Sequence, residues 1–76
     1  MENAKLSELK TGDKAVLSRI EGVEISRHKR LIELGLVSGA KIEVLKKEKN
    51  IMLVGTRGYA LSLDGLVTNC IEVYRG

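Results

Sequence analysis

Short apolar runs, most of them alternating with polar residues, fill the second half of the chain. Runs of this length between glycine-rich or charged breaks are typical of strands joined as hairpins. A charged tip at residues 46–50 joins the first pair, and a turn at residues 57–58 precedes the next run. We therefore predict four antiparallel strands, over residues 41–44, 51–54, 59–63 and 71–74. Residues 66–70 are expected to form a single helical turn.

A further strand is predicted near the N-terminus, after a turn at residues 12–13. Within residues 14–20, Ala15 and Leu17 lie on one face of a strand, whereas Ile20 breaks the alternation. Ile20 reaches the same face only if the strand twists or bulges locally. We therefore expect an irregular strand whose apolar face belongs to the core.

Residues 26–36 have the one convincing helical pattern. Ser26 is a residue type that caps helix N-termini, and Gly35 can adopt the left-handed conformation that ends a helix. With Gly35 just past the end, Leu31 and Leu36 occupy the positions that touch in a Schellman motif. A helix of this length is marginal alone, so we expect it to pack on a sheet.

Five short strands and one inserted helix predict a mainly β fold, a small and strongly curved antiparallel barrel. Closure would remove the exposed strand edges of an open sheet. A chain of 76 residues is long enough for one domain only, so residues 1–76 are expected to form a single domain. The core must be aliphatic, because the chain has two tyrosines and no Phe or Trp.

Charge and cysteine content favour a cytoplasmic protein. The 13 basic and 10 acidic residues give a net charge of +3, with both signs mixed along the chain, so nucleic acid is allowed but not favoured as a partner. The single cysteine, Cys70, excludes an internal disulfide and fits a reducing compartment. No apolar run approaches the roughly 20 residues that span a bilayer, so membrane insertion is not expected.

The sequence shows no pattern of catalytic or metal-binding residues. His28 and Cys70 lie far apart in the sequence and are too few for a structural zinc site. The glycines at positions 35 and 39 follow the helix, whereas a phosphate-binding loop must precede one. We therefore expect no cofactor, no metal site and no enzymatic activity.

A basic cluster at residues 27–30 leaves RNA binding open as an alternative function. The lysine-rich tip at residues 46–49 would help to hold phosphates. Binding of single strands usually adds aromatic stacking, for which Tyr59 and Tyr74 are the only candidates. A solvated basic surface is the simpler interpretation of this cluster.

Residues 30–39, Arg-Leu-Ile-Glu-Leu-Gly-Leu-Val-Ser-Gly, resemble the Arg-Leu-x-Glu-Leu-Gly-Leu-x-x-Gly signature of the ferrous iron transport protein A (FeoA) family. The resemblance implies an SH3-like barrel with a helix inserted after the first strand. It also implies a small cytosolic accessory protein of ferrous iron uptake. Its partner would be the cytosolic part of a large membrane iron transporter that carries a GTPase domain.

The same resemblance supplies the candidate partner-binding residues, which are Arg30, Leu31, Glu33, Leu34, Leu36 and Gly39. The leucines and the glycine are equally well explained by core packing and turn geometry. Arg30 and Glu33 are the better candidates for partner contact, since charged residues are seldom needed in a core. Ser38 departs from the family, which usually has proline there, and this change affects the stiffness of the turn.

Overall fold

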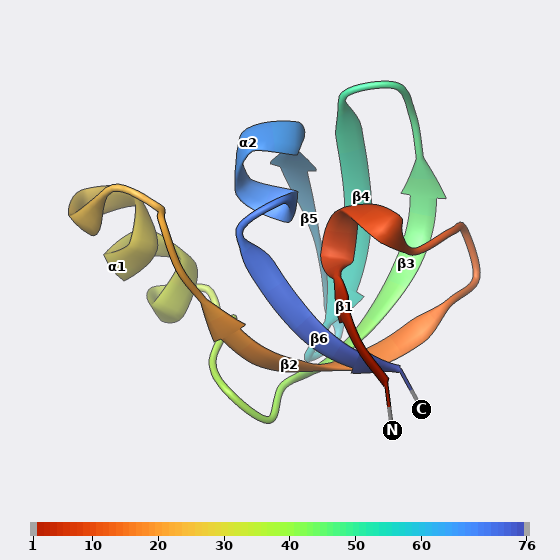
Figure 1. Cartoon of the computed structure of the whole chain (residues 1–76), viewed down its shortest axis with the longest axis horizontal. Coiled ribbons are helices and arrows are strands. Elements are labelled where there is room, and N and C mark those ends of the chain that lie inside the picture. Colours follow the sequence, from red (N-terminus) through yellow and green to blue (C-terminus); the bar gives the residue numbers. More distant parts are fainter. Residues whose placement is uncertain (1, 76) are drawn as a thin grey trace.

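Six strands form one antiparallel sheet that curls around an aliphatic core in the computed structural model, which describes residues 2–75 (Figure 1). The strands are β1 (Glu2–Lys5), β2 (Lys14–Ile20), β3 (Lys41–Lys47), β4 (Ile51–Thr56), β5 (Tyr59–Asp64) and β6 (Ile71–Arg75). The helical elements are the 3-10 turn η1 (Leu6–Glu8), α1 (Ile25–Glu33) and α2 (Gly65–Thr68). The predicted mainly β class with one inserted helix is confirmed.

The sheet has the strand order β1-β6-β2-β3-β4-β5, which adds one strand to the five predicted. The additional strand, β1, has no apolar alternation of its own and forms by pairing with the last strand, β6. Residues 2 and 75 face each other in this pair, so the two ends of the described chain lie together, away from α1 (Figure 1). Within residues 2–75, β1 and β5 do not pair with each other. The expected closure of the barrel is therefore incomplete, and both edge strands keep a free side.

The irregular strand predicted after the first turn is confirmed. In β2, Ala15, Leu17 and Ile20 are all buried, and the pairing with β6 shifts register between Leu17 and Arg19. This bulge turns Ile20 back to the core face. Thr56 is the exception within the core, because its side-chain oxygen is buried and has no hydrogen-bond partner in residues 2–75.

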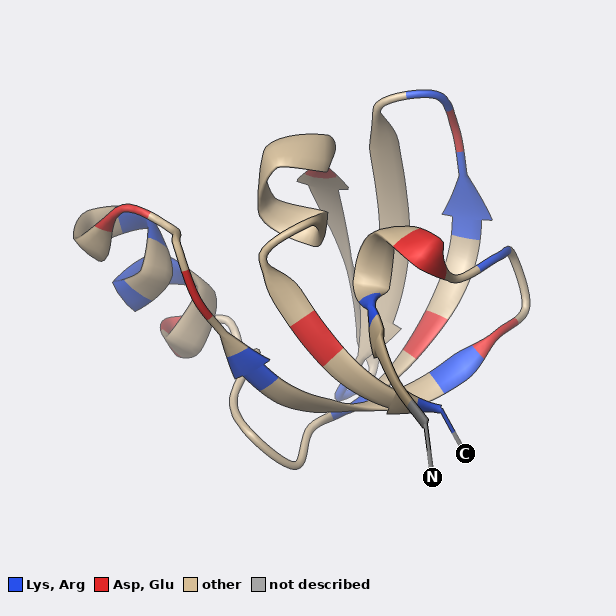
Figure 2. Cartoon of the chain, in the orientation of Figure 1, with Lys and Arg blue, Asp and Glu red and all other residues tan. Residues whose placement is uncertain are grey.

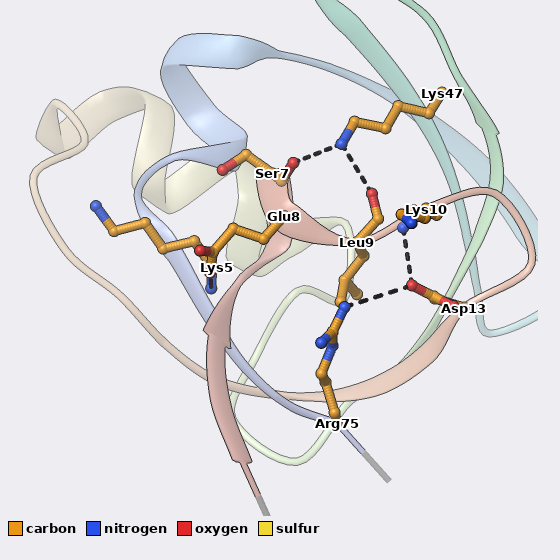
Figure 3. Close-up of polar contacts among 8 residues, drawn as sticks. All are labelled: Lys5, Ser7, Glu8, Leu9, Lys10, Asp13, Lys47 and Arg75. Atoms are coloured by element: carbon orange, nitrogen blue, oxygen red, sulfur yellow. Dashed lines mark hydrogen bonds and ion pairs between the residues drawn. The ribbon is translucent and has the colours of Figure 1, made fainter.

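A lysine from the charged hairpin holds the N-terminal segment against the sheet (Figure 3). The ammonium of Lys47 donates to the backbone oxygens of Ser7 and Leu9, at 2.7 and 2.9 Å. Leu6, in the 3-10 turn η1, and Leu9, just after it, are completely buried. Lys47 thus has a structural role that its place in the sequence does not indicate.

The predicted cap of α1 is wrong, whereas its predicted end is confirmed. The helix begins at Ile25, so Ser26 lies inside the first turn, and its hydroxyl donates to the carboxylate of Glu24. At the other end Gly35 has φ +98° and donates its N–H to the oxygen of Ile32 at 2.9 Å. The N–H of Leu36 reaches the oxygen of Leu31 at 3.0 Å, which completes a Schellman motif.

Candidate functional site

Helix α1 is tied at both ends to β5, an edge strand of the sheet. At the C-terminal end of the helix, the Tyr59 hydroxyl donates to the backbone oxygen of Leu34. In the first turn, the Arg27 guanidinium pairs with the carboxylate of Asp64. Tyr59 is the first residue of β5 and Asp64 is the last, so the two ties span the length of the strand.

A groove of about 360 Å³ lies between these two ties. Its lining includes the aliphatic side chains of Leu31, Leu34, Leu61, Leu63 and Val67. On the rim, α1 contributes Arg27 and Arg30, and β5 contributes Ser62 and Asp64. The groove therefore combines an apolar surface with a few charged groups, which is the usual composition of a site that recognises a peptide or a small apolar ligand.

Asp64 is the polar centre of this site. One of its carboxylate oxygens accepts from Arg27, and the other accepts the Val67 backbone N–H at 3.1 Å and so caps α2. The hydrogen bond from Arg27, and next the one from Val67, lower the pKa of Asp64 below its usual value. The carboxylate stays charged at neutral pH and keeps Arg27 in place.

A second hollow, of about 310 Å³, lies beyond the ion pair at the N-terminal end of α1. Arg27 and Val67 line both hollows, so the ion pair separates them. Leu66 lines the second hollow and is 77% exposed, and Ile25 at the start of α1 is 86% exposed. Apolar side chains thus remain open to solvent at this end of the site.

The structure brings together only part of the candidate site predicted from the sequence. Arg30, Leu31 and Leu34 line the groove, with Arg30 exposed, Leu31 buried and Leu34 half-buried. The remaining candidates do not line it: Glu33 is exposed, Leu36 is buried beneath the helix end, and Gly39 lies in a turn at φ +90°. The structural explanation of Leu31 and Leu36, packing in the core, holds for both.

Sequence reasoning missed the residues of the site that come from β5. Asp64 before a short helical turn is a typical capping signal, and this pattern could have identified it. Tyr59 gives no comparable signal, because its partner Leu34 is 25 residues away in the sequence.

The profile of the FeoA domain matches residues 4–75, nearly the whole chain. The chain belongs to the FeoA family. Solved structures agree: an FeoA protein from Chlorobium tepidum is 35% identical, with a TM-score of 0.88 over 95% of this chain and 70% of that one. A zinc-complexed FeoA from Stenotrophomonas maltophilia, described as a prokaryotic SH3 domain protein, is 24% identical with a TM-score of 0.82. The superposition covers 92% of this chain and 88% of the Stenotrophomonas chain. At 24% identity this likeness shows the fold alone. The predicted SH3-like fold is confirmed.

A curated relative links the family to ferrous iron transport. It is a fusion protein of Porphyromonas gingivalis that joins Fe(2+) transport protein A to the Fe(2+) transporter FeoB. It is 50% identical over 42 residues, which are 55% of this chain. The matched segment spans only 5% of the fusion protein.

In the described part of this FeoA domain, the side chains that could bind a metal ion are dispersed. Among residues 2–75, no three His, Cys, Asp or Glu side chains come close enough to hold a metal ion. His28 on α1 is half-buried, and so is Cys70. None of the helices in the described part of the chain is long and apolar enough to cross a membrane.

Three of the six lysines and arginines that suggested RNA binding are engaged within this FeoA domain. Figure 2 shows the basic residues of α1 well apart from those of the β3–β4 hairpin. Arg27 pairs with Asp64, Lys46 lies 3.3 Å from the Glu48 carboxylate, and Lys47 binds backbone oxygens. Lys29, Arg30 and Lys49 have no ion-pair partner in the described chain. These charges, on α1 and on the distant hairpin tip, do not form one continuous strip.

Proposed function

We propose that this chain is a small, non-enzymatic, cytoplasmic accessory protein of a ferrous iron uptake system. It acts by protein contact with the cytosolic part of the membrane iron transporter, which carries a GTPase domain. The groove between α1 and β5 is the docking site. The observation that carries this proposal is the groove itself, in a chain of the FeoA family: an aliphatic hollow whose rim carries Arg30, an arginine without an ion-pair partner in residues 2–75.

The fusion of a related domain to an iron transporter supports the choice of partner. In the Porphyromonas gingivalis protein, Fe(2+) transport protein A and the Fe(2+) transporter FeoB are joined in one polypeptide. Covalent linkage of two domains raises their effective concentration, which favours fusion of partners that contact each other. The same contact is therefore expected between this chain and its transporter.

The groove suits binding better than catalysis. Its charged groups are Arg27, Arg30 and Asp64, and two of the three already neutralise each other. A peptide-binding groove needs shape and a few anchoring groups rather than a titrating acid or base. Arg30 and Leu34 are therefore expected to contact the partner directly, whereas Leu36 holds the helix end and Gly39 holds the following turn to Leu17 of β2.

A pair of charge reversals on α1 tests this proposal. Arg30→Glu places a negative charge on the rim of the groove, whereas Lys29→Glu makes the same change at an exposed position that does not line it. Both should fold, because exposed charges contribute little to stability. We expect Arg30→Glu to weaken binding of the transporter's cytosolic domain about tenfold and to impair iron uptake, with Lys29→Glu close to the parent chain. Equal effects of the two would place the interface elsewhere.

The double variant Arg30→Glu, Glu33→Arg keeps the net charge and extends the test. It should remain folded by circular dichroism and fail to restore ferrous iron uptake in a strain that lacks the native protein. Full restoration would contradict a role for this face of α1.

A further inference from the structure

Strand β5 has a free edge, because it is the last strand of the sheet and pairs only with β4 among residues 2–75. The two strands are joined by the two-residue turn Arg57-Gly58, whose φ angles of 52° and 86° are those of a type I′ turn. Such a turn makes the flanking residues, Thr56 and Tyr59, a hydrogen-bonded pair. This fixes the direction of every backbone group along β5.

Alternate residues of an antiparallel strand direct both N–H and C=O to the same side. Since Tyr59 pairs with Thr56, Leu61 and Leu63 also direct their backbone groups to β4. Ala60 and Ser62 then direct theirs to the free edge, and both residues are exposed. The edge of β5 thus offers two N–H donors and two C=O acceptors.

The free edge and the groove coincide. Ser62 lines the groove beside Leu61, and Leu34 and Arg30 line it from α1. A segment that pairs with Ser62 would therefore lie in the same hollow as the aliphatic side chains. Backbone pairing and apolar contact are available to one ligand at once.

The edge of β5 lacks three common protections against pairing. Edge strands are commonly blunted by proline, lysine or a bulge. Residues 59–64 contain no proline or lysine, and their pairing with β4 has no register shift, whereas the β2–β6 and β3–β4 pairs each have one. The opposite edge strand, β1, carries Lys5. A regular edge without proline, lysine or a bulge is suited to accept another strand.

We propose that the partner binds by strand addition: an extended segment of the transporter's cytosolic part pairs with the backbone of Ala60 and Ser62. An aliphatic side chain of that segment enters between Leu34 and Leu61. The choice of the transporter as partner rests on the proposed function, whereas the mode of binding rests on the edge of β5 alone.

Charge further specifies the added segment. Asp64 already neutralises Arg27, whereas Arg30 on the same rim is exposed and has no carboxylate partner in the described chain. An opposite charge on the ligand would complement Arg30. The segment should therefore carry an acidic residue close to its aliphatic anchor.

Proline at Ser62 tests the mode of binding separately from the docking site. Proline removes the outward N–H but is tolerated on an edge strand where that N–H does not join the ladder. The matched control, Ser62→Ala, removes the hydroxyl and keeps the N–H. We expect Ser62→Pro to weaken binding of the transporter's cytosolic domain in calorimetry at least tenfold more than Ser62→Ala does, because only proline removes the N–H. Parent-like binding by a folded Ser62→Pro would overturn strand addition and leave the Arg30 docking test standing.

Amide hydrogen exchange on the unmodified chain gives a second test that does not depend on the folding of a variant. Addition of the transporter's cytosolic domain should slow exchange of the Ser62 and Ala60 amides. Binding without such protection would overturn strand addition alone, whereas absence of binding would overturn the proposed function with it. Protection that rises with protein concentration in the absence of the transporter would assign the edge to a second copy of this chain and overturn the proposal.

Discussion

The hydroxyl of Tyr59 donates a hydrogen bond to the backbone oxygen of Leu34, the residue that ends α1. Carbonyl groups at a helix C-terminus have no partner within the helix, so this hydroxyl satisfies one of them. The contact joins residues 25 positions apart and, with the Arg27–Asp64 pair 37 positions apart, places α1 alongside β5. The groove exists because of these two long-range contacts.

Tyr59→Phe should loosen α1 without unfolding the sheet. Loss of one hydrogen bond costs about 1 kcal/mol of unfolding free energy, and the effect should concentrate in the helix. Hydrogen exchange of the α1 amides should accelerate more than that of the β2 amides. Tyr74→Phe is the control, since no hydrogen bond of the Tyr74 hydroxyl is found within residues 2–75. A similar loss in both variants would contradict the role of the Tyr59 hydroxyl.

Gly35→Ala should be more destabilising than Gly39→Ala in denaturant unfolding. Both glycines have a positive φ, so a side chain is strained at either position by about 1 kcal/mol. At Gly35 an added Cβ would also lie 3.0 Å from Cδ of Arg57 and 3.2 Å from the Tyr59 hydroxyl oxygen, whereas at Gly39 it would meet nothing within 4 Å. Equal losses of unfolding free energy in the two variants would show that the closeness of Arg57 and Tyr59 to Gly35 does not add to the destabilisation.

Asp64 should titrate below the usual Asp pKa of about 3.9 in an NMR titration of the folded chain. Because the folded state lowers this pKa, the tie between α1 and β5 is fully present above the usual value. It is lost as the pH falls through the lower pKa of the folded chain. Arg27→Ala removes the main cause of the lowered pKa and should raise the pH midpoint of the Asp64 titration. Lys29→Ala is the control and should leave this midpoint unchanged. An identical midpoint in the parent and Arg27→Ala would contradict this assignment.

Thr56→Val should stabilise the chain, by about 1 kcal/mol in chemical denaturation. A buried hydroxyl without a partner costs free energy, and valine replaces it with a methyl group of similar shape. Thr68→Val is the comparison, because Thr68 is also a buried residue but its hydroxyl donates to the Gly65 oxygen at 3.4 Å. A gain at Thr68 as large as that at Thr56 would mean that the missing partner is not the cause.

Local patterns predicted most of the fold because each one depends on neighbouring residues. Short apolar runs, most of them alternating, predicted β2 to β6, the broken alternation at Ile20 predicted the bulge, and Gly35 predicted the helix end. β1 was missed because its four residues become a strand only by pairing with β6 at the other end of the chain. The start of α1 was misplaced because Ser26 is only one of several polar residues there that can precede a helix.

The candidate site was less predictable than the fold, and for a related reason. Arg30 and Leu34 were identified through a family signature that is contiguous in sequence. Their counterparts Tyr59 and Asp64 belong to β5, whose alternation predicts a strand but says nothing of its neighbour across the groove. A pairing of this kind follows from the tertiary fold and has no sequence pattern.

The pairing of β1 with β6 has a consequence for how such a domain is joined to other polypeptides. Residues 2 and 75 lie side by side, well separated from α1 in Figure 1. A linker attached at either end would therefore start from the same point and leave the groove unobstructed. The domain is equally suited to be appended at one end or inserted into a host loop, and a circular permutant that joins the two ends and opens at the β3–β4 tip is a reasonable design.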